Sequence, residues 1–210
     1  MPNKQDIQLL RIVALIHIIG FIGINFSPFA QLFLQSSQFN FYFIALCYSL
    51  TLKNFKRKQL LGLFLIFTLG MFIEIIGVKT GFPFGKYNYT NRLGVQLAQV
   101  PICIGFNWIL VCLGSIAWGK KITPRFFWIP ALLLLLLFDA LLEPVAIELG
   151  YWIWQSKLPP IQNYIAWLIV GFVGMQFAEK YKLPTSHFLK GVLAIQFVFF
   201  IGFKLIDLLK

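Results

Sequence analysis

Seven long, mostly apolar stretches dominate the chain. They cover residues 9–26, 38–52, 59–78, 95–118, 126–145, 161–178 and 188–208. A helix needs about 20 mostly apolar residues to cross the roughly 30 Å hydrocarbon core of a bilayer. The second stretch is the least apolar, because the polar segment 35–38 interrupts it. The pattern predicts an all-α bundle of about seven transmembrane helices, forming a single integral membrane domain over residues 1–210.

The composition excludes several classes of protein. Hydrophobic residues make up 59% of the chain and charged residues 12%, against roughly 45–50% and 25% in soluble domains. So few charges argue against a cytosolic enzyme, a disordered chain and a nucleic-acid partner, despite a net charge of +11. Cys47, Cys103 and Cys112 lie in apolar stretches without CxxC spacing. We expect them to be small core residues and not a disulfide or metal site.

The lysines and arginines predict the orientation of the bundle. If the N-terminus lies inside the cell, the inner side holds two thirds of the 18 basic residues, namely Lys4, Arg11, Lys53, Lys56, Arg57, Lys58, Lys120, Lys121, Arg125, Lys180, Lys182 and Lys190. The outer side holds Lys79, Lys86, Arg92, Lys157, Lys204 and Lys210. Cytoplasmic loops carry an excess of Lys and Arg. We therefore expect a multi-pass protein of the inner cell membrane with a cytoplasmic N-terminus and an external C-terminus.

Acidic residues are rare, and Glu74, Asp139 and Glu143 lie inside predicted spans. At 1.5 Å per residue they lie about 22, 20 and 26 Å from the cytoplasmic ends of those spans. Because the two spans run in the same direction, their carboxyls reach one level of the membrane. Asp139 and Glu143 are also four residues apart, so they share one helix face. An ionised Asp at mid-helix costs about 2.5–3.5 kcal/mol, so this convergence requires a physical cause.

Two causes remain open from the sequence. The carboxyls could tie helices together by pairing with Lys79, Arg92 or the indole and phenol donors of the loops. Alternatively, burial and acidic neighbours favour the protonated form of one carboxyl, which could then donate its proton to an alkene. A second carboxylate would orient the water that captures the carbocation. This chemistry needs no cofactor, and the sequence contains no metal-ligand cluster, phosphate loop or dinucleotide fingerprint.

Aromatic residues near these carboxyls are the candidate substrate contacts. An aromatic face stabilises a carbocation by cation–π attraction, worth about 2 kcal/mol or more when water is excluded. The candidate faces are Tyr87, Tyr89, Trp152, Trp154 and Trp167. The loop residues among them fit an interfacial aromatic belt equally well. Asn163 is a candidate hydrogen-bond donor, whereas His17 is more typical of a packed core histidine.

The two regions that hold the carboxyls share a pattern. In each, an acidic residue in a span is followed by a glycine, an aromatic pair and a further span with a tryptophan. The first set is Glu74, Gly77, Tyr87, Tyr89 and Trp108, and the second is Glu143, Gly150, Trp152, Trp154 and Trp167. A parallel duplication, which transporter folds also use, is one interpretation.

Two motifs in these regions resemble a known family. The first is EIIGVKTG at 74–81, followed by PFGKYNY at 83–89, LG at 93–94 and VP at 100–101. The second is Asp139-x-x-x-Glu143-Pro-Val-Ala, followed by Trp152-x-Trp154, Pro160, Asn163 and Trp167. Together they resemble the membrane-bound hydratases of carotenoid biosynthesis, which include bacterial γ-carotene 1′-hydroxylases and archaeal bisanhydrobacterioruberin hydratases. The resemblance covers roughly residues 60–175. Glu143 stands where many relatives have Asp, which keeps the acid and lengthens its reach.

The resemblance implies a carotenoid 1,2-hydratase, a C=C hydratase of the carbon–oxygen lyase type. It would add water across the terminal C1–C2 double bond of an acyclic carotenoid such as lycopene, through a tertiary carbocation. Asp139 or Glu143 would be the general acid, and Glu74 or the remaining carboxyl would position water. The expected partners are a lipid-soluble carotenoid, water, the membrane and other enzymes of the carotenoid pathway.

Two other functions remain as alternatives. A carotenoid or isoprenoid cyclase or isomerase would use the same alkene protonation without adding water. A non-enzymatic membrane carrier would use the carboxyls as a relay. A relay needs a polar path across both leaflets, and the cytoplasmic halves of spans 59–78 and 126–145 contain few polar residues.

Overall fold

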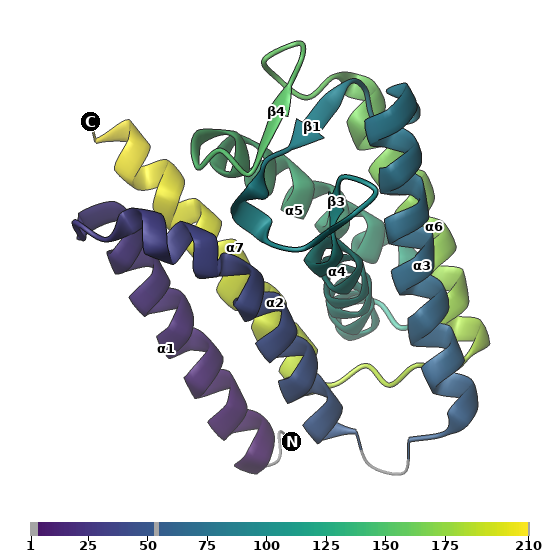
Figure 1. The fold of residues 1–210 in the computed structure, drawn as a ribbon. Helices are drawn as coiled ribbons and strands as arrows, with labels where there is room; N and C mark the ends of the chain where they lie inside the picture. The colour runs from purple at the N-terminus through teal and green to yellow at the C-terminus, as the bar shows by residue number, and fades with distance from the viewer. Residues whose placement is uncertain (1–3, 53–54, 210) are drawn as a thin grey trace.

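The computed structural model describes residues 4–52 and 55–209, and this part of the chain is a helical bundle (Figure 1). Its seven α-helices are α1 (Lys4–Phe26), α2 (Ala30–Thr51), α3 (Arg57–Thr80), α4 (Ile102–Ile122), α5 (Trp128–Glu148), α6 (Ile161–Lys180) and α7 (His187–Leu208). Each predicted apolar stretch falls on one of them, which confirms the all-α polytopic class. Lys53 and Lys210, which were counted in the prediction of membrane orientation, lie outside the described residues.

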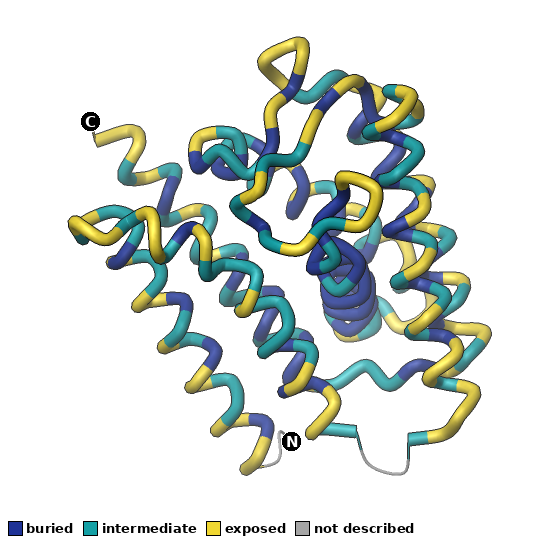
Figure 2. Tube along the Cα trace, viewed as in Figure 1, coloured by how far each residue is buried: buried dark blue, intermediate teal, exposed yellow. Residues whose placement is uncertain are grey.

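Six of the seven described helices are long and apolar enough to cross a membrane. The exception is α2, which is 22 residues long but contains the polar segment 35–38 near its N-terminal end. The protein is therefore a multi-pass membrane protein. α4 lies at the centre, and almost its whole length is buried, whereas α1 is peripheral and packs on α2 and α7 (Figure 2). Cys47, Cys103 and Cys112 are free and buried, as predicted.

Two predicted helix boundaries were wrong. α2 begins at Ala30 and not at residue 38, because the polar segment 35–38 continues the helix instead of breaking it. α4 begins at Ile102 and not at residue 95. The preceding residues form a hairpin of β2 (Gln96–Leu97) and β3 (Val100–Pro101). Ala98 and Gln99 have φ values of 50° and 71°, and a two-residue hairpin turn of type I′ requires positive φ at both positions.

A glycine with positive φ follows both α3 and α5, and each helix leads to a short strand. Gly81 terminates α3 in the left-handed conformation, with φ 78°, and its N–H donates to the Gly77 carbonyl oxygen. Gly150 follows α5 with φ 66°. Glycine tolerates this conformation without a steric penalty, which is why it commonly follows a helix C-terminus. The chain then continues into β1 (Tyr87–Tyr89) and β4 (Trp152–Trp154), which pair antiparallel.

The β1 loop is fixed to the C-terminal end of α5. The Arg92 guanidinium, in η1 (Asn91–Leu93), donates through Nη1 to the carbonyl oxygen of Leu149. The Thr90 hydroxyl donates to the Gly150 carbonyl oxygen at 2.7 Å. A cation at a helix C-terminus also interacts favourably with the helix dipole. These contacts hold both strands over one end of the bundle.

We expect Arg92→Met to destabilise the protein without removing a carboxyl group from the bundle. Hydrogen bonds to charged groups contribute about 1.5–3 kcal/mol, and Arg92 is half-buried, so a loss of about 1–2 kcal/mol is expected. Thermal unfolding in detergent, followed by circular dichroism, should show a lower midpoint. The control is Lys86→Met, which removes an exposed lysine from the same loop. Equal midpoints for the two variants would show that the Arg92 contact does not stabilise the fold.

Candidate active site

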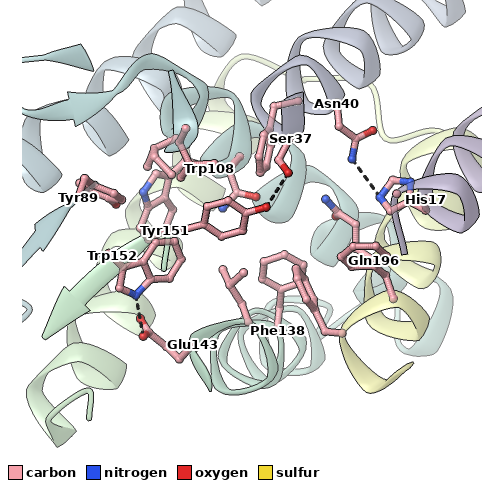
Figure 3. A pocket seen from close by; sticks show the side chains of 18 of the residues that line it. His17, Ser37, Asn40, Tyr89, Trp108, Phe138, Glu143, Tyr151, Trp152 and Gln196 are labelled. Carbon is pink, nitrogen blue, oxygen red and sulfur yellow. Dashed lines mark hydrogen bonds between the residues drawn. The ribbon is translucent and has the colours of Figure 1, made fainter. Parts of the chain in front are cut away.

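A cavity of about 480 Å³ lies inside the bundle. Its lining comes from all seven helices and from the β1 and β4 segments, and most of it is apolar. Glu74 and Glu143 are the acidic residues in the lining. In Figure 3, Glu143 and Trp152 lie on one side of the cavity, His17, Asn40 and Gln196 lie on the other, and Tyr151 and Phe138 lie between them. Two predicted site carboxyls from different helices therefore face one chamber.

Glu74 is held by three donors from three different elements. Its side chain points inward from α3 and is 4% exposed. Tyr87 donates a short hydrogen bond to Oε2, and the Tyr89 hydroxyl donates to the same oxygen at 2.9 Å. The indole Nε1 of Trp108, on α4, donates to Oε1 at 3.3 Å. Both oxygens of Glu74 therefore accept hydrogen bonds, the arrangement that an ionised carboxylate can satisfy because it only accepts.

Glu143 is held differently. It is 3% exposed, on the inner face of α5. Trp152 and Trp154 both donate through Nε1 to Oε2, at 3.0 and 2.8 Å. Among the described residues no group donates to Oε1, and Glu143 is part of the cavity lining. One oxygen of Glu143 is thus fixed, and the other is available to the cavity.

The pairing of β1 with β4 brings the two carboxyl groups into one structure. Tyr87 pairs with Trp154 and Tyr89 with Trp152, and their ring centroids are 4.8 and 5.8 Å apart. Residues that alternate along a strand point to the same face, so all four rings lie over the carboxyls. These residues point into the protein and bind carboxyls, so they do not form an aromatic belt.

The phenols of β1 stay protonated at neutral pH. Burial, followed by the nearby Glu74 carboxyl, raises the pKa of both Tyr87 and Tyr89 well above the usual value of 10. Both side chains therefore remain hydrogen-bond donors over the physiological range. Burial also raises the pKa of Tyr151 to about 12. Its hydroxyl forms a hydrogen bond with the Ser37 hydroxyl of α2, at an oxygen–oxygen distance of 2.5 Å.

Asp139 lies close to this site but outside the lining of the cavity. It is fully buried, and Asn163 of α6 donates through Nδ2 to its Oδ2 at 2.9 Å. Within residues 4–52 and 55–209, no group donates to Oδ1 or accepts from it. Asn163 does line the cavity. Asp139 is therefore connected to the cavity only indirectly, through its hydrogen bond with Asn163.

Two stacked tryptophans complete the wall next to Glu74. Trp108 and Trp167 have ring centroids 4.3 Å apart at an interplanar angle of 28°, and both line the cavity. Trp167 was predicted as a substrate contact, whereas Trp108 was identified only through the repeated pattern. A buried indole N–H usually has an acceptor. The need of Trp108 for such an acceptor was the signal that could have linked this residue to Glu74.

The donors that bind Glu74 and Glu143 are neutral side chains. In the part of the chain that the structure describes, neither Lys79 nor Arg92 forms an ion pair with the three carboxyls, and the ion pairs there are Lys120–Glu179 and Lys204–Asp207. Phenol and indole donors bind Glu74 and Glu143 instead. These contacts join α3 to β1 and to α4, and α5 to β4, so the carboxyls also hold elements of the fold together. They also leave both carboxyls on the cavity.

Polar residues on the far wall of the cavity were largely missed. His17 of α1 bonds through Nδ1 to the Val13 carbonyl oxygen at 2.8 Å, and Asn40 of α2 lies 3.2 Å from His17 Nε2. Gln196 of α7 is buried in the same lining. Polar side chains inside apolar stretches commonly face a bundle interior. Their position in such stretches was the signal that could have identified these residues. No group of three or more His, Cys, Asp or Glu residues that could hold a metal ion occurs among the described residues.

Comparisons with known proteins identify the family of this chain. A family model described as "Carotenoid biosynthesis protein" matches residues 36–208. The bisanhydrobacterioruberin hydratase of Haloarcula japonica is 32% identical over 117 residues, which cover 49% of this chain and 39% of that protein. The chain thus spans about two fifths of the length of this curated relative. No solved structure shows a significant match. Because the family model covers most of the chain, including every residue of the carboxyl site, this protein belongs to the carotenoid biosynthesis protein family.

Proposed function

We propose that the protein is a carotenoid 1,2-hydratase that adds water across the terminal C1–C2 double bond of an acyclic carotenoid. The observation that carries this proposal is that Glu74 and Glu143, from two membrane-spanning helices, face one apolar cavity. Acid-catalysed hydration needs a proton donor, a group that orients water and surroundings that stabilise a cation. The family and the name of the curated relative add support for hydration of a carotenoid.

The hydrogen bonds favour different roles for the two carboxyls. Glu143 accepts both of its indole donors on Oε2, so Oε1 is free to hold a proton toward the cavity. Glu74 accepts donors on both oxygens, which favours its ionised form. We therefore assign the general acid to Glu143 and the positioning of water to Glu74.

The reaction then proceeds in two balanced steps. The Oε1–H of Glu143 donates its proton to C2, which forms a C–H bond and leaves a tertiary cation at C1. Water attacks C1 and releases one proton to Glu74, giving a tertiary alcohol. A proton then returns from Glu74 to Glu143 by exchange with water, which restores the starting state. No cofactor takes part in either step.

The remaining predicted site residues support this chemistry. The aromatic faces of β1 and β4, and the stacked pair Trp108 and Trp167, provide cation–π stabilisation in a chamber with little water. Asn163 would donate or accept a hydrogen bond at the cavity wall. Asp139 would hold Asn163 in place and touch neither the polyene nor the water.

The proposal includes a location in the cell. An excess of Lys and Arg on one side of the bundle supports an inner-membrane protein with its N-terminus in the cytoplasm. With α3 and α5 running outward, Glu74 and Glu143 lie about 26 and 23 Å along their helices from Arg57 and Trp128. The site would then lie in the outer half of the membrane, beneath the β1–β4 pair. The chain would act as a single membrane domain.

The direct test is expression in a bacterial host that accumulates lycopene. Pigments extracted from the membranes are separated by chromatography and weighed by mass spectrometry. We expect new pigments heavier than lycopene by one or two molecules of water. Pigments of unchanged mass but altered retention would support a cyclase or isomerase instead. Unchanged lycopene, with the protein present in the membrane fraction, would overturn the hydratase proposal for this substrate.

A further inference from the structure

One wall of the cavity comes from α1 and α2, and along this wall the cavity reaches the membrane-facing surface. The lining residues from these helices include Ile16, Ile19 and Gly20 of α1, and Ser36, Phe39 and Asn40 of α2. Ile19 and Phe39 are 49% and 62% exposed. A side chain that lines the cavity and is also this exposed marks a place where the cavity opens outward. We call the line between α1 and α2 at these residues the α1–α2 seam.

Gly20 occupies an unusual position in this seam. Glycine is unfavourable in the middle of a helix, and in membrane helices it usually permits two helices to approach closely. Gly23, one turn further along α1, fits that explanation, because a Cβ there would lie 2.5 Å from the Phe33 ring. A Cβ at Gly20 would meet no heavy atom within 4 Å. Close packing therefore does not require Gly20, and its missing side chain leaves space in the wall.

The seam lies at the level of the carboxyls. α1 and α3 run in the same direction (Figure 1). Gly20 is about 24 Å along α1 from Lys4, and Glu74 is about 26 Å along α3 from Arg57. A molecule that enters through the seam would thus reach the carboxyls without moving far along the membrane normal.

A long polyene needs such an opening. The cavity volume of about 480 Å³ is within the usual range for sites of drug-sized ligands, so it can hold the reacting end of a long chain but not the whole chain. The remainder must stay in the hydrocarbon core, which is apolar like the exposed side chains of the seam. A hydrogen bond between Asn40 and His17, 3.2 Å long, joins the two helices beside Gly20, and such contacts in membranes are weak on average.

We propose that the α1–α2 seam at Gly20 is the lateral portal through which the end of an acyclic polyene passes from the bilayer into the cavity. This inference takes the class of ligand from the proposed function but does not depend on hydration. A bulky side chain at Gly20 would block the portal while leaving Glu74, Glu143 and the strands unchanged.

The test measures polyene binding in lipid nanodiscs. Phytofluene, an acyclic polyene whose absorption overlaps tryptophan emission, serves as the probe, and stopped-flow quenching gives association and dissociation rates. We expect Gly20→Phe to lower both rates at least tenfold and to change Kd less than threefold, because a portal is crossed in both directions. The control Ile165→Phe, which adds the same side chain at an exposed position of α6 outside the cavity lining, should stay within twofold of the unmodified protein. Phe39→Ala removes bulk from the opposite edge and should raise the association rate severalfold.

Each outcome decides the inference. Unchanged rates in Gly20→Phe, with a normal thermal unfolding midpoint, would overturn the portal. A weakened Kd with an unchanged association rate would also overturn it, since Gly20 would then be part of the binding chamber alone. If Gly20→Phe fails to fold, the Phe39→Ala rate decides in its place. If the portal behaves as expected but no carotenoid gains water, the hydratase proposal fails and the portal remains.

Discussion

Replacing Glu143 by glutamine is expected to lower the rate of lycopene hydration at least a hundredfold. General acid catalysis contributes about 10²–10⁴ to a rate, and a hundredfold loss corresponds to about 2.7 kcal/mol in activation free energy. Glutamine keeps an oxygen that Trp152 and Trp154 can donate to, at the position where they now bind Oε2. The substitution therefore removes the transferable proton and leaves most of the local contacts. Initial rates in membranes, normalised to the amount of protein, measure the effect.

The matched control is Glu148→Gln, on the same helix. Glu148 is exposed at the C-terminal end of α5, so its variant makes the same chemical change outside the cavity. Its hydration rate should remain within twofold of that of the unmodified protein. If Glu143→Gln retained more than a tenth of the rate, Glu143 would be a structural residue that anchors β4, and the acid would have to be another group.

Much of the fold could be predicted because apolar length is a local property. The runs at 59–78 and 161–178 match α3 and α6 to within a few residues. The failures came where local hydropathy and backbone geometry disagree. Residues 95–101 are apolar enough to extend α4, but Ala98 and Gln99 turn the chain into a hairpin. Hydropathy contains no information about such a turn.

The level of the candidate site in the membrane could be predicted, but not which of the carboxyls face the cavity. The rise per residue placed Glu74, Asp139 and Glu143 at one level, and the structure puts two of them on one cavity. Which carboxyl faces the cavity depends on the rotation of α5 about its axis, and that rotation is set by packing against α4, α6 and α7. One helix face can include Asp139 and Glu143 while only Glu143 reaches the chamber.

The pairing of β1 with β4 could not be predicted at all. Each strand has three residues, and 62 residues separate Tyr89 from Trp152 in the chain. The repeated aromatic pairs indicated that the two regions are similar, but similarity does not reveal contact. The antiparallel register explains the repetition physically. Each strand supplies two aromatic donors to the carboxyl of the helix before it, and the strands stabilise each other.

Replacing Glu74 by glutamine is expected to lower hydration at least a hundredfold as well, but through a different step. If Glu74 orients water, its loss leaves Glu143 able to protonate the alkene, and the cation then returns its proton instead of capturing water. Some loss of stability is also expected, because the amide nitrogen of glutamine cannot accept a hydrogen bond from Tyr87, Tyr89 or Trp108. The rate of hydration alone cannot separate these two effects.

Deuterium exchange separates them. In membranes suspended in D₂O, reversible protonation by Glu143 would place deuterium in the recovered lycopene, which mass spectrometry detects. The Glu74→Gln variant should keep this exchange within tenfold of the unmodified protein while its hydration falls a hundredfold. Glu143→Gln should lose both exchange and hydration. The reverse pattern, with exchange retained in Glu143→Gln and lost in Glu74→Gln, would make Glu74 the acid. The three donors that hold Glu74 would then serve to orient a protonated carboxyl, and the assignment drawn from the free oxygen of Glu143 would be wrong.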